Sequence, residues 1–348
     1  MSGPQCCANP PTLNPSSGAG HVEKVGGLDS YVSGSPDSKL VILLVSDILW
    51  TLCGYEAPNL RKLADKIAAA GFYAVVPDFF YGDPFVPGNA EKPLQVWIKD
   101  HGMVSSWRSL CYIDSVLWIV EHQISRPSVN STLQVDKGYE DAKPVIEALN
   151  SKGVTAIGAV GFCWGAKVVV ELGKSSAFIK AAVLCHPSFV TVDDIKELKV
   201  PISILGAEID QLSPPALLKQ FEDVLASKSE AAVRYVDSFV KVFPKVAHGW
   251  TVRYNVEDEA AVKSAEEAHG NLLEWFVKYV KRAWILELLK KQHYQRSVQY
   301  KEEMTDVRIF AMLIKTCITY ARAVMITTVR NAKSNSYCCA VRKMGSSK

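Results

Sequence analysis

Cys163 lies in a stretch whose residue types and spacing predict covalent catalysis. The sequence Gly-Phe-Cys-Trp-Gly, residues 161–165, separates an apolar run from a second apolar run with helical spacing. Glycine at the second position on each side of a nucleophile is typical of the nucleophile elbow, a sharp strand-to-helix turn, here with cysteine in place of serine. The N–H groups of the following helix point toward charge that develops beside such a side chain. We therefore expect Cys163 to be a nucleophile, while this pentapeptide alone also fits a buried structural cysteine.

A carboxylate and a histidine follow Cys163 in the order that such an active site requires. Asp210 ends one predicted strand and His248 follows the next, which gives the chain order nucleophile, acid and histidine. His186, at the end of another predicted strand, is a rival base, although a structural strand-end histidine is the preferred interpretation. We expect His248 to be the base because it follows the last predicted strand, beside Gly249.

Three motifs together resemble one enzyme family. Residues 161–167, 206–214 and 246–253 are similar to the dienelactone hydrolase (carboxymethylenebutenolidase-like) family, and in particular to its plant members, from about Val22 to Lys281. The resemblance implies an α/β-hydrolase fold, a three-layer α/β sandwich with a mostly parallel sheet of about eight strands flanked by helices. It also implies a carboxylic ester hydrolase that opens small esters or lactones through an acyl-thioester, with no metal or organic cofactor.

The family's site residues can be carried over by motif. Cys163 is then the nucleophile, His248 the general base and acid, and Asp210 the carboxylate that orients the histidine. The backbone N–H groups of Ile48 and Trp164 are expected to form the oxyanion hole.

Three further residues are expected to contact substrate or to tune the thiol. Asp47 occupies a position where the family often has an acidic residue near the resting thiol, and an anion there would raise the thiol pKa. Simple loop capping is the alternative for Asp47. Tyr81 is expected in an aromatic wall of the pocket together with Phe79 and Phe80. Arg253 could bind an anionic substrate through two hydrogen bonds, or form a surface ion pair with the acidic run at 257–259.

Continuous apolar runs predict strands that are buried on both faces of a parallel sheet. Strands are expected at 39–45, 72–78, 155–160, 181–187, 200–210 and 239–244, with a helix at 57–71 that ends at Gly71. The first two strands and this helix make a right-handed β-α-β unit. The side chains after each strand should then meet at one edge of the sheet.

The chain divides into a core and segments outside the family pattern. Residues 1–20 are expected to be a flexible leader and 21–281 the hydrolase domain, with atypical insertions at about 49–53 and 103–135. The second insertion could be a lid, with a helix from Ser105 to Gln123. The preferred interpretation is that the segments outside the family pattern derive from a retained intron or an alternative gene model. The first insertion falls within the oxyanion loop. Residues 282–348 form a basic extension.

The distribution of charge and the number of cysteines limit which partners and which cellular location we expect. The extension carries 13 Lys and Arg against 4 Asp and Glu, whereas residues 1–281 carry 26 against 32, so the excess of +9 belongs to the extension. The nine cysteines, with no secretory signal at the start, favour reduced thiols and a cytoplasmic location. We expect a monomer or homodimer, no nucleic-acid partner and no transmembrane span. Lys315 and Arg322 interrupt the apolar stretch at 309–329, which leaves a weak membrane-surface contact of the basic tail as the alternative.

Two competing functions stay open at this point. The chain could be a catalytically silent α/β-hydrolase scaffold that binds a small molecule. It could also share the endo-1,3;1,4-β-glucanase label of plant family members. Glycosidases ordinarily need two carboxylates that flank the scissile bond, and Asp210 is expected to be committed to His248, so ester or lactone hydrolysis is preferred.

Overall fold

The computed structural model describes residues 18–47, 55–83, 90–93, 96–97, 136–230 and 236–344. The chain divides into two compact units, 1–284 and 285–348. Both insertions, the expected lid helix and residue Ile48 lie outside the described residues.

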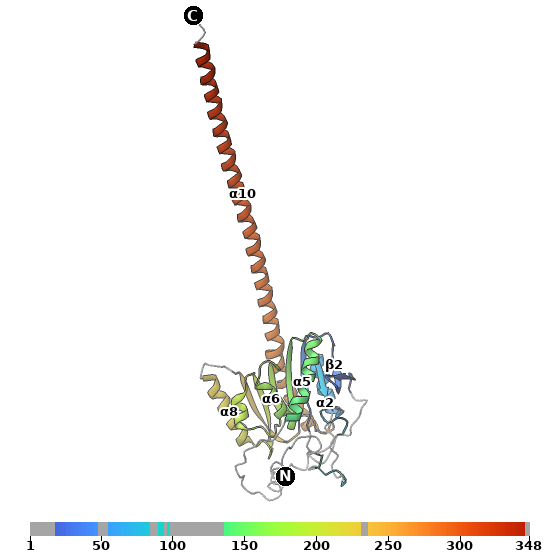
Figure 1. Cartoon of the computed structure of the whole chain (residues 1–348). Coiled ribbons are helices and arrows are strands. Elements are labelled where there is room, and N and C mark those ends of the chain that lie inside the picture. Colours follow the sequence, from blue (N-terminus) through green and yellow to red (C-terminus); the bar gives the residue numbers. More distant parts are fainter. Residues whose placement is uncertain are drawn as a thin grey trace. The chain divides into compact units, whose positions relative to one another are not determined.

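Eight strands form one sheet in the first unit (Figure 1). They are β1 (His21–Val25), β2 (Leu28–Ser33), β3 (Leu40–Val45), β4 (Tyr73–Pro77), β5 (Ala156–Phe162), β6 (Ala181–Cys185), β7 (Ile202–Ile209) and β8 (Ser238–Ala247). Their order in the sheet is β1-β2-β4-β3-β5-β6-β7-β8. β1 and β2 pair antiparallel and β2 is antiparallel to β4, whereas the strands from β4 to β8 are parallel. The predicted mostly parallel α/β sheet is thus confirmed.

Helices cover both faces of the sheet. The elements are α2 (Pro58–Ala69), α5 (Asp136–Ser151), α6 (Trp164–Gly173), α7 (Val192–Glu197), α8 (Pro215–Glu230), α9 (Glu259–Phe276), the π-helical turn η1 (Val277–Lys281) and α10 (Arg282–Met344). Helices α5, α6, α7 and α8 pack in one apolar cluster with alternate residues of β3, such as Leu43. Helices α2 and α9 pack in a second cluster with the intervening residues, such as Ile42. The two clusters are the two halves of a three-layer sandwich.

The sequence of β3 explains its central position. All six residues, Leu-Val-Ile-Leu-Leu-Val, are buried because both faces of a parallel sheet are covered by helices. Helix α2 then returns the chain to β4, as the apolar spacing predicts. It ends before Gly71, whose φ of +92° lies in the left-handed region that glycine adopts most readily.

The domain begins earlier than its composition predicts. The Ala19 N–H donates a hydrogen bond to Asp65 Oδ2 at 2.9 Å, and the Gly20 N–H donates to the Tyr31 hydroxyl at 2.7 Å. Residues 18–20, expected within the leader, are therefore attached to β2 and α2.

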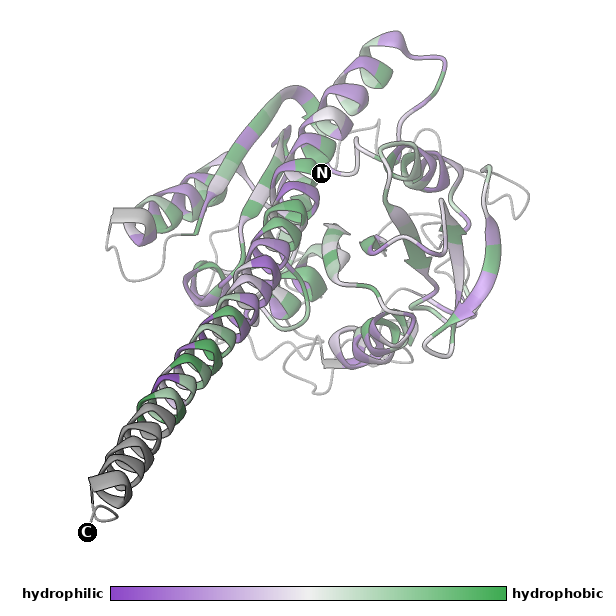
Figure 2. Cartoon of the chain, turned by 90° about the horizontal axis from the view of Figure 1, so that it is seen from above, coloured by the Kyte–Doolittle hydropathy of each residue, from purple (hydrophilic) through white to green (hydrophobic). Residues whose placement is uncertain are grey.

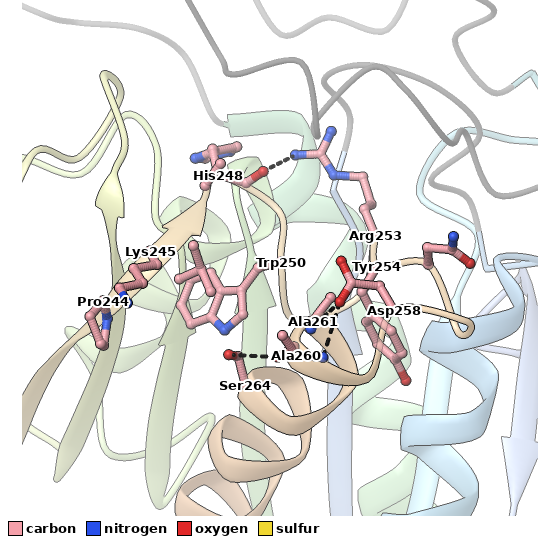
Figure 3. Close-up of a pocket in the computed structure, with 13 residues that line it drawn as sticks. Pro244, Lys245, His248, Trp250, Arg253, Tyr254, Asp258, Ala260, Ala261 and Ser264 are labelled. Atoms are coloured by element: carbon pink, nitrogen blue, oxygen red, sulfur yellow. Dashed lines mark hydrogen bonds between the residues drawn. The ribbon is translucent and has the colours of Figure 1, made fainter.

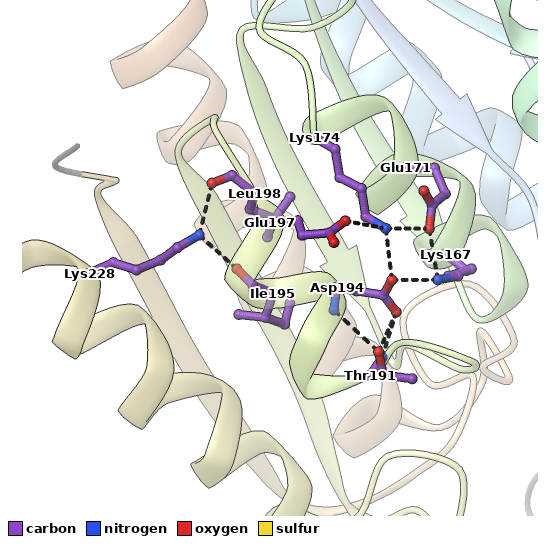
Figure 4. Close-up of polar contacts among 9 residues, drawn as sticks. All are labelled: Lys167, Glu171, Lys174, Thr191, Asp194, Ile195, Glu197, Leu198 and Lys228. Carbon is purple, nitrogen blue, oxygen red and sulfur yellow. Dashed lines mark hydrogen bonds and ion pairs between the residues drawn. The ribbon is translucent and has the colours of Figure 1, made fainter. Parts of the chain in front are cut away.

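A network of charged side chains connects α6 to α7 (Figure 4). Lys167 Nζ lies 2.7 Å and Lys174 Nζ 3.0 Å from Asp194 Oδ1, and both lysines also pair with Glu171. Asp194 closes a capping box with Thr191 at the start of α7. Burial opposes the charged form, but the contacts from Lys167 and Lys174 outweigh it and lower the pKa of Asp194 to about 2.

Helix α10 accounts for the described part of the second unit. Among the described residues, the run Glu259–Ile326 is the one helical stretch long and apolar enough, by length and composition, to cross a membrane, and none of its most apolar window is buried. Figure 2 shows hydrophilic (purple) and hydrophobic (green) residues alternating over the first part of α10, whereas hydrophobic residues predominate farther along the helix. The expectation that no segment spans a membrane stays a prediction.

Candidate active site

Five parallel strands end beside five polar or reactive side chains. Asp47 follows β3, Cys163 follows β5, His186 follows β6, Asp210 follows β7 and His248 follows β8, each within two residues of the strand end. Because the carboxyl ends of parallel strands meet at one edge of a sheet, these side chains gather there. The predicted edge site is therefore present in the fold.

Cys163 occupies a sharp turn between β5 and α6. Its φ of 53° and ψ of −111° lie outside the regions that cysteine normally adopts. A Cβ on Gly161 would lie 2.2 Å from the Gly165 carbonyl oxygen, and a Cβ on Gly165 would lie 2.2 Å from the Val45 carbonyl oxygen. Only glycine fits at these two positions, so the predicted elbow geometry is confirmed.

Asp210 and His248 form a buried pair. Asp210 Oδ2 lies 2.7 Å from His248 Nδ1. The same carboxylate accepts hydrogen bonds from the Leu212 N–H and from the N–H and hydroxyl of Ser213. Burial opposes ionisation, but the charge and hydrogen bond of His248 and these donors lower the pKa of Asp210. An ionised carboxylate beside Nδ1 favours the tautomer with the proton on Nδ1, which makes Nε2 the basic nitrogen.

The Cys163 thiol is fully buried. Its Sγ lies 3.2 Å from Ser188 Oγ, and the Ser188 N–H donates to the Cys163 carbonyl oxygen at 3.0 Å. Burial, and next the negative charge of Asp47, raise the pKa of the thiol well above its ordinary value, whereas the contact with Ser188 lowers it. The resting side chain is therefore a protonated thiol at neutral pH.

Asp47 is a buried anion next to Arg253. Its Oδ2 lies 3.3 Å from Arg253 Nη2 and 3.7 Å from His186 Nε2. Although burial opposes the charge, Arg253 and then His186 hold the pKa of Asp47 well below its ordinary value. The interactions of Asp47 therefore go beyond the simple loop capping that was the alternative for this residue.

Arg253 lies inside the domain and only 8% of it is exposed. Besides its pair with Asp47, its Nη2 donates to the His248 carbonyl oxygen at 3.4 Å (Figure 3). The alternative of a surface ion pair with residues 257–259 is wrong, because the guanidinium is buried with Asp47. An anionic substrate would have to share this guanidinium with the aspartate.

His186 is part of the site rather than a distant structural histidine. Its ring centroid lies 4.9 Å from that of His248, and its Nδ1 lies 3.3 Å from Thr251 Oγ1. Burial lowers its pKa to about 4, so it is neutral at pH 7. Its φ of 38° and the φ of 60° at Phe189 place two non-glycine residues of one short loop in the left-handed region. Strain of this kind is concentrated at functional sites.

One group of three residues in the described part of the chain could hold a metal ion. Ligand atoms of Asp47, His186 and His248 lie within 4.8 Å of one another. The guanidinium of Arg253, 3.3 Å from the Asp47 carboxylate, opposes a second positive charge at this place. The donor set therefore fits a cation poorly.

Two further predicted site residues can be placed. Trp164 is the first residue of α6, so its backbone N–H lies at the helix N-terminus next to Cys163, and its ring contacts those of Phe79 and Phe80. Tyr81 is 54% exposed, and its ring lies beneath Lys137 Nζ at 4.0 Å. Of the expected aromatic wall, Phe79 and Phe80 are buried against Trp164, whereas Tyr81 is exposed and contacts Lys137.

A cavity of about 300 Å³ lies beside the His248 loop (Figure 3). It runs from the end of β8 along the loop to the first turns of α9, and its lining includes His248, Trp250, Arg253 and Tyr254. Cys163 does not line it. The cavity therefore adjoins His248 rather than Cys163.

Sequence reasoning missed Ser188 and Thr251. Ser188 contacts the sulfur and Thr251 contacts His186. Ser188 lies outside the three motifs, and Thr251 lies within residues 246–253 without an expected role of its own. The one available signal was their position, two or three residues after His186 and His248 at strand ends.

Comparisons with known proteins give relatives over most of the first unit. The model of the dienelactone hydrolase family matches residues 28–280. An endo-1,3;1,4-beta-D-glucanase of Zea mays is 37% identical over 239 residues, which cover 67% of this chain and 65% of the maize protein, just under two thirds of its length. A carboxymethylenebutenolidase homolog of Mus musculus is 30% identical over 266 residues, which cover 76% of this chain and 92% of the mouse protein. The solved dienelactone hydrolase of Anabaena variabilis superposes with a TM-score of 0.44 at 12% identity, over 77% of this chain and all of that one.

Proposed function

The chain belongs to the dienelactone hydrolase family, and we propose that it hydrolyses small carboxylic esters or lactones with a Cys163–His248–Asp210 triad. One observation carries the proposal: a cysteine in an elbow and a histidine held by a buried carboxylate follow three strands of the same parallel sheet. Nucleophilic catalysis requires this combination of a constrained nucleophile, a base and a group that orients the base.

Acylation begins with proton transfer from the thiol. His248 Nε2 takes the proton of Cys163, and Sγ attacks the ester carbonyl carbon. The developing oxyanion is stabilised by the Trp164 N–H and by the N-terminal end of α6. The tetrahedral intermediate collapses as the C–O bond breaks, and the leaving alkoxide takes the proton from His248. The product of this step is an acyl-thioester on Cys163.

Deacylation reverses the roles. Water gives a proton to His248 Nε2 as its oxygen attacks the thioester carbonyl, and the thiolate leaves and is reprotonated by the imidazolium. Asp210 stabilises the imidazolium through the 2.7 Å contact with Nδ1 in both steps. The pair therefore supports both halves of the cycle.

Asp47 restrains the resting nucleophile. Its charge and the burial of Cys163 keep the thiol protonated until substrate enters. A carbonyl substrate that separates Asp47 from the sulfur would remove the electrostatic cost of thiolate formation. Reactivity would then be coupled to substrate binding.

Thiolate chemistry limits the substrate class. A thiolate leaves a tetrahedral intermediate more readily than an alkoxide, so the reaction proceeds only with good leaving groups. Phenyl esters and enol-lactones meet this requirement better than amides or alkyl esters. The buried Arg253 offers a positive charge for a substrate carboxylate that can compete with Asp47.

The proposal can be tested with a panel of small phenyl esters and enol-lactones. Cys163→Ala is expected to lower kcat/KM by about a thousandfold or more. Cys185→Ala is the matched control because it removes another buried thiol near the same sheet edge, and it is expected to retain most of the activity. Full ester turnover by Cys163→Ala would contradict the proposal.

The name of the maize relative supplies a second candidate, β-glucan hydrolysis. Glycosidases need two carboxylates that flank the scissile bond. Asp210 is paired with His248 and Asp47 with Arg253, so both carboxylates of this site already hold cationic or basic partners. Release of reducing sugar from mixed-linkage glucan by both wild type and Cys163→Ala would favour this second activity. Absence of turnover on both substrate classes, with a ligand still bound, would favour a silent scaffold.

A further inference from the structure

The segment Val307–Ile326 of α10 is an exposed helix with an unusual distribution of charge. All of its described side chains are exposed, and it contains three cations and no Asp or Glu. The large hydrophobic residues exposed along it are Val307, Ile309, Phe310, Met312, Leu313, Ile314, Ile318, Tyr320, Val324, Met325 and Ile326. An isolated apolar helix of this kind is unfavourable in water, so its surface indicates a partner.

The three cations form one stripe along the helix. Arg308, Lys315 and Arg322 are spaced by seven residues. Seven residues make nearly two α-helical turns, with a drift of about 20° per repeat. The three positive charges therefore lie within about 40° of one another around the helix axis.

The opposite side of the helix is apolar over a wide arc. At 3.6 residues per turn, about half of the circumference opposite the cation stripe carries no charged residue. That arc holds Ile309, Phe310, Leu313, Ile314, Cys317, Tyr320 and Val324. The segment is thus amphipathic, with a narrow cationic stripe and a broad apolar face.

We propose that Val307–Ile326 binds the surface of an anionic lipid bilayer. An apolar face with a cationic opposite side is the pattern of helices that lie in the interface, where the long basic side chains reach the headgroups. The unit from residue 285 onward carries 12 Lys and Arg against 4 Asp and Glu, an excess of 12 − 4 = +8. This excess complements the negative potential of such a surface.

A bilayer surface fits the segment better than a second copy of the chain. A two-stranded coiled coil buries a narrow seam, for which Phe310, Leu313, Cys317, Tyr320 and Val324 have the right spacing of three and four residues. That pairing would leave apolar side chains of the same face outside the seam, namely Ile309 and Ile314. The apolar face is wider than a dimer seam covers.

In-plane binding also fits better than a transmembrane span. Lys315 and Arg322 lie within the apolar stretch, and a basic side chain near the middle of a bilayer is costly. In the interface, by contrast, the stripe stays at headgroup depth along its whole length. The charges then contribute to binding instead of opposing it.

Sedimentation of the full chain with vesicles tests the proposal. Binding is expected to vesicles with about 30% phosphatidylserine, to be much weaker to pure phosphatidylcholine, and to be reversed at high salt. Arg308→Gln, Lys315→Gln and Arg322→Gln combined should weaken binding to the anionic vesicles by about a hundredfold. Leu313→Ser with Ile314→Ser should also reduce it, since the apolar face supplies the rest of the affinity.

A matched control distinguishes the effect of the cation stripe on binding from the effect of removing any three positive charges. Lys290→Gln, Lys291→Gln and Arg296→Gln remove three exposed cations from the same helix outside the segment, and should weaken binding by less than about tenfold. An equal loss in this control, or equal binding to both kinds of vesicle, overturns the proposal. Salt-resistant binding with protease protection of the segment would show a span instead. If the protein forms a dimer without lipid, and Leu313→Ser abolishes that dimer, the partner is a second copy of the chain.

Discussion

The surroundings of Cys163 act on its thiol in opposite directions, some groups favouring the thiolate and others, such as Asp47, opposing it. The elbow places Cys163 at the N-terminal end of α6, where the helix dipole would stabilise a thiolate. Burial and the charge of Asp47, however, raise the pKa of the thiol. Arg253 keeps Asp47 charged, so the restraint persists at neutral pH. The balance of these groups sets the thiolate fraction of Cys163, the proposed nucleophile.

Replacing Asp47 by asparagine should release that restraint. Loss of the anion lowers the pKa of Cys163, so the thiolate fraction at neutral pH increases. A fall of one unit corresponds to about a tenfold faster alkylation under these conditions. The rate profile of Cys163 with a small alkylating agent, followed by peptide mass spectrometry, should move to lower pH.

Ser188→Ala is a control that should shift the pKa of the Cys163 thiol in the opposite direction. The Ser188 contact at 3.2 Å lowers the pKa of the thiol, so its removal should move the same profile to higher pH. Asp193→Asn, which removes an exposed carboxylate outside the site, should leave it unchanged. An unchanged profile in Asp47→Asn would mean that the carboxylate does not govern the thiol.

Among individual residues, the sequence predicts those that belong to short motifs. Cys163, Asp210 and His248 follow from glycine spacing and chain order. The pairing of Arg253 with Asp47 and the contact of Ser188 with the sulfur do not, because each joins residues far apart in the chain. Such contacts depend on loop conformations that local patterns do not specify.

The elbow requires α6 to lie so close to β3 that residue 165 has no room for a methyl group. Gly165→Ala would bring its Cβ to 2.2 Å from the Val45 carbonyl oxygen, so α6 would have to move from β3. We expect a loss of about 3 kcal/mol in the free energy of unfolding, measured by urea titration.

Gly270→Ala is the matched control for that substitution. Gly270 lies within α9, and a Cβ there would meet no atom within 4 Å. Alanine should therefore raise the free energy of unfolding by about 1 kcal/mol through helix propensity. Similar effects of the two substitutions would show that the close crossing is not required.

The charged network between α6 and α7 gives a pH-dependent prediction. Asp194→Asn leaves Lys167 and Lys174 without their shared carboxylate and should cost about 3 kcal/mol at pH 7. Because the folded pKa of Asp194, about 2, lies below its ordinary 3.8, the stabilisation is present above pH 4 and is lost as the pH falls toward 2.

The difference between wild type and Asp194→Asn should therefore shrink over that acidic interval. Unfolding titrations at several pH values measure it. Asp193→Asn, in an exposed pair with Lys196, should cost less than about 1 kcal/mol at any pH. A constant difference down to pH 2 would contradict the assignment.

At the element scale, apolar patterning predicted the parallel strands and α2 within a few residues. Strands β3, β4, β5 and β6 are fully buried runs of predominantly apolar residues, as burial on both faces of a parallel sheet requires. The antiparallel strands β1 and β2 were not recognised, because β1 alternates poorly and is mostly exposed.

The whole molecule divides into one unit that holds the candidate site and a second unit with different surface chemistry. Within the described residues, the buried apolar core ends at Val280. The side chains of the proposed triad all precede Asn255, and the lining of the cavity beside His248 ends at Ser264. A chain that ends at Trp284 should therefore keep the ester activity, with kcat/KM within about twofold of the full chain. Loss of folding on this truncation, seen by circular dichroism, would show that the second unit supports the first.

The most direct test of the proposed chemistry is the site of acylation during turnover. A phenyl ester is mixed with the protein, the reaction is quenched in acid within the first turnover, and the peptides are analysed by mass spectrometry. The expected result is one acyl group on Cys163, labile to hydroxylamine, that forms before the free acid appears. Turnover with no acyl group on Cys163, or with the acyl group on another residue, would contradict the proposed function.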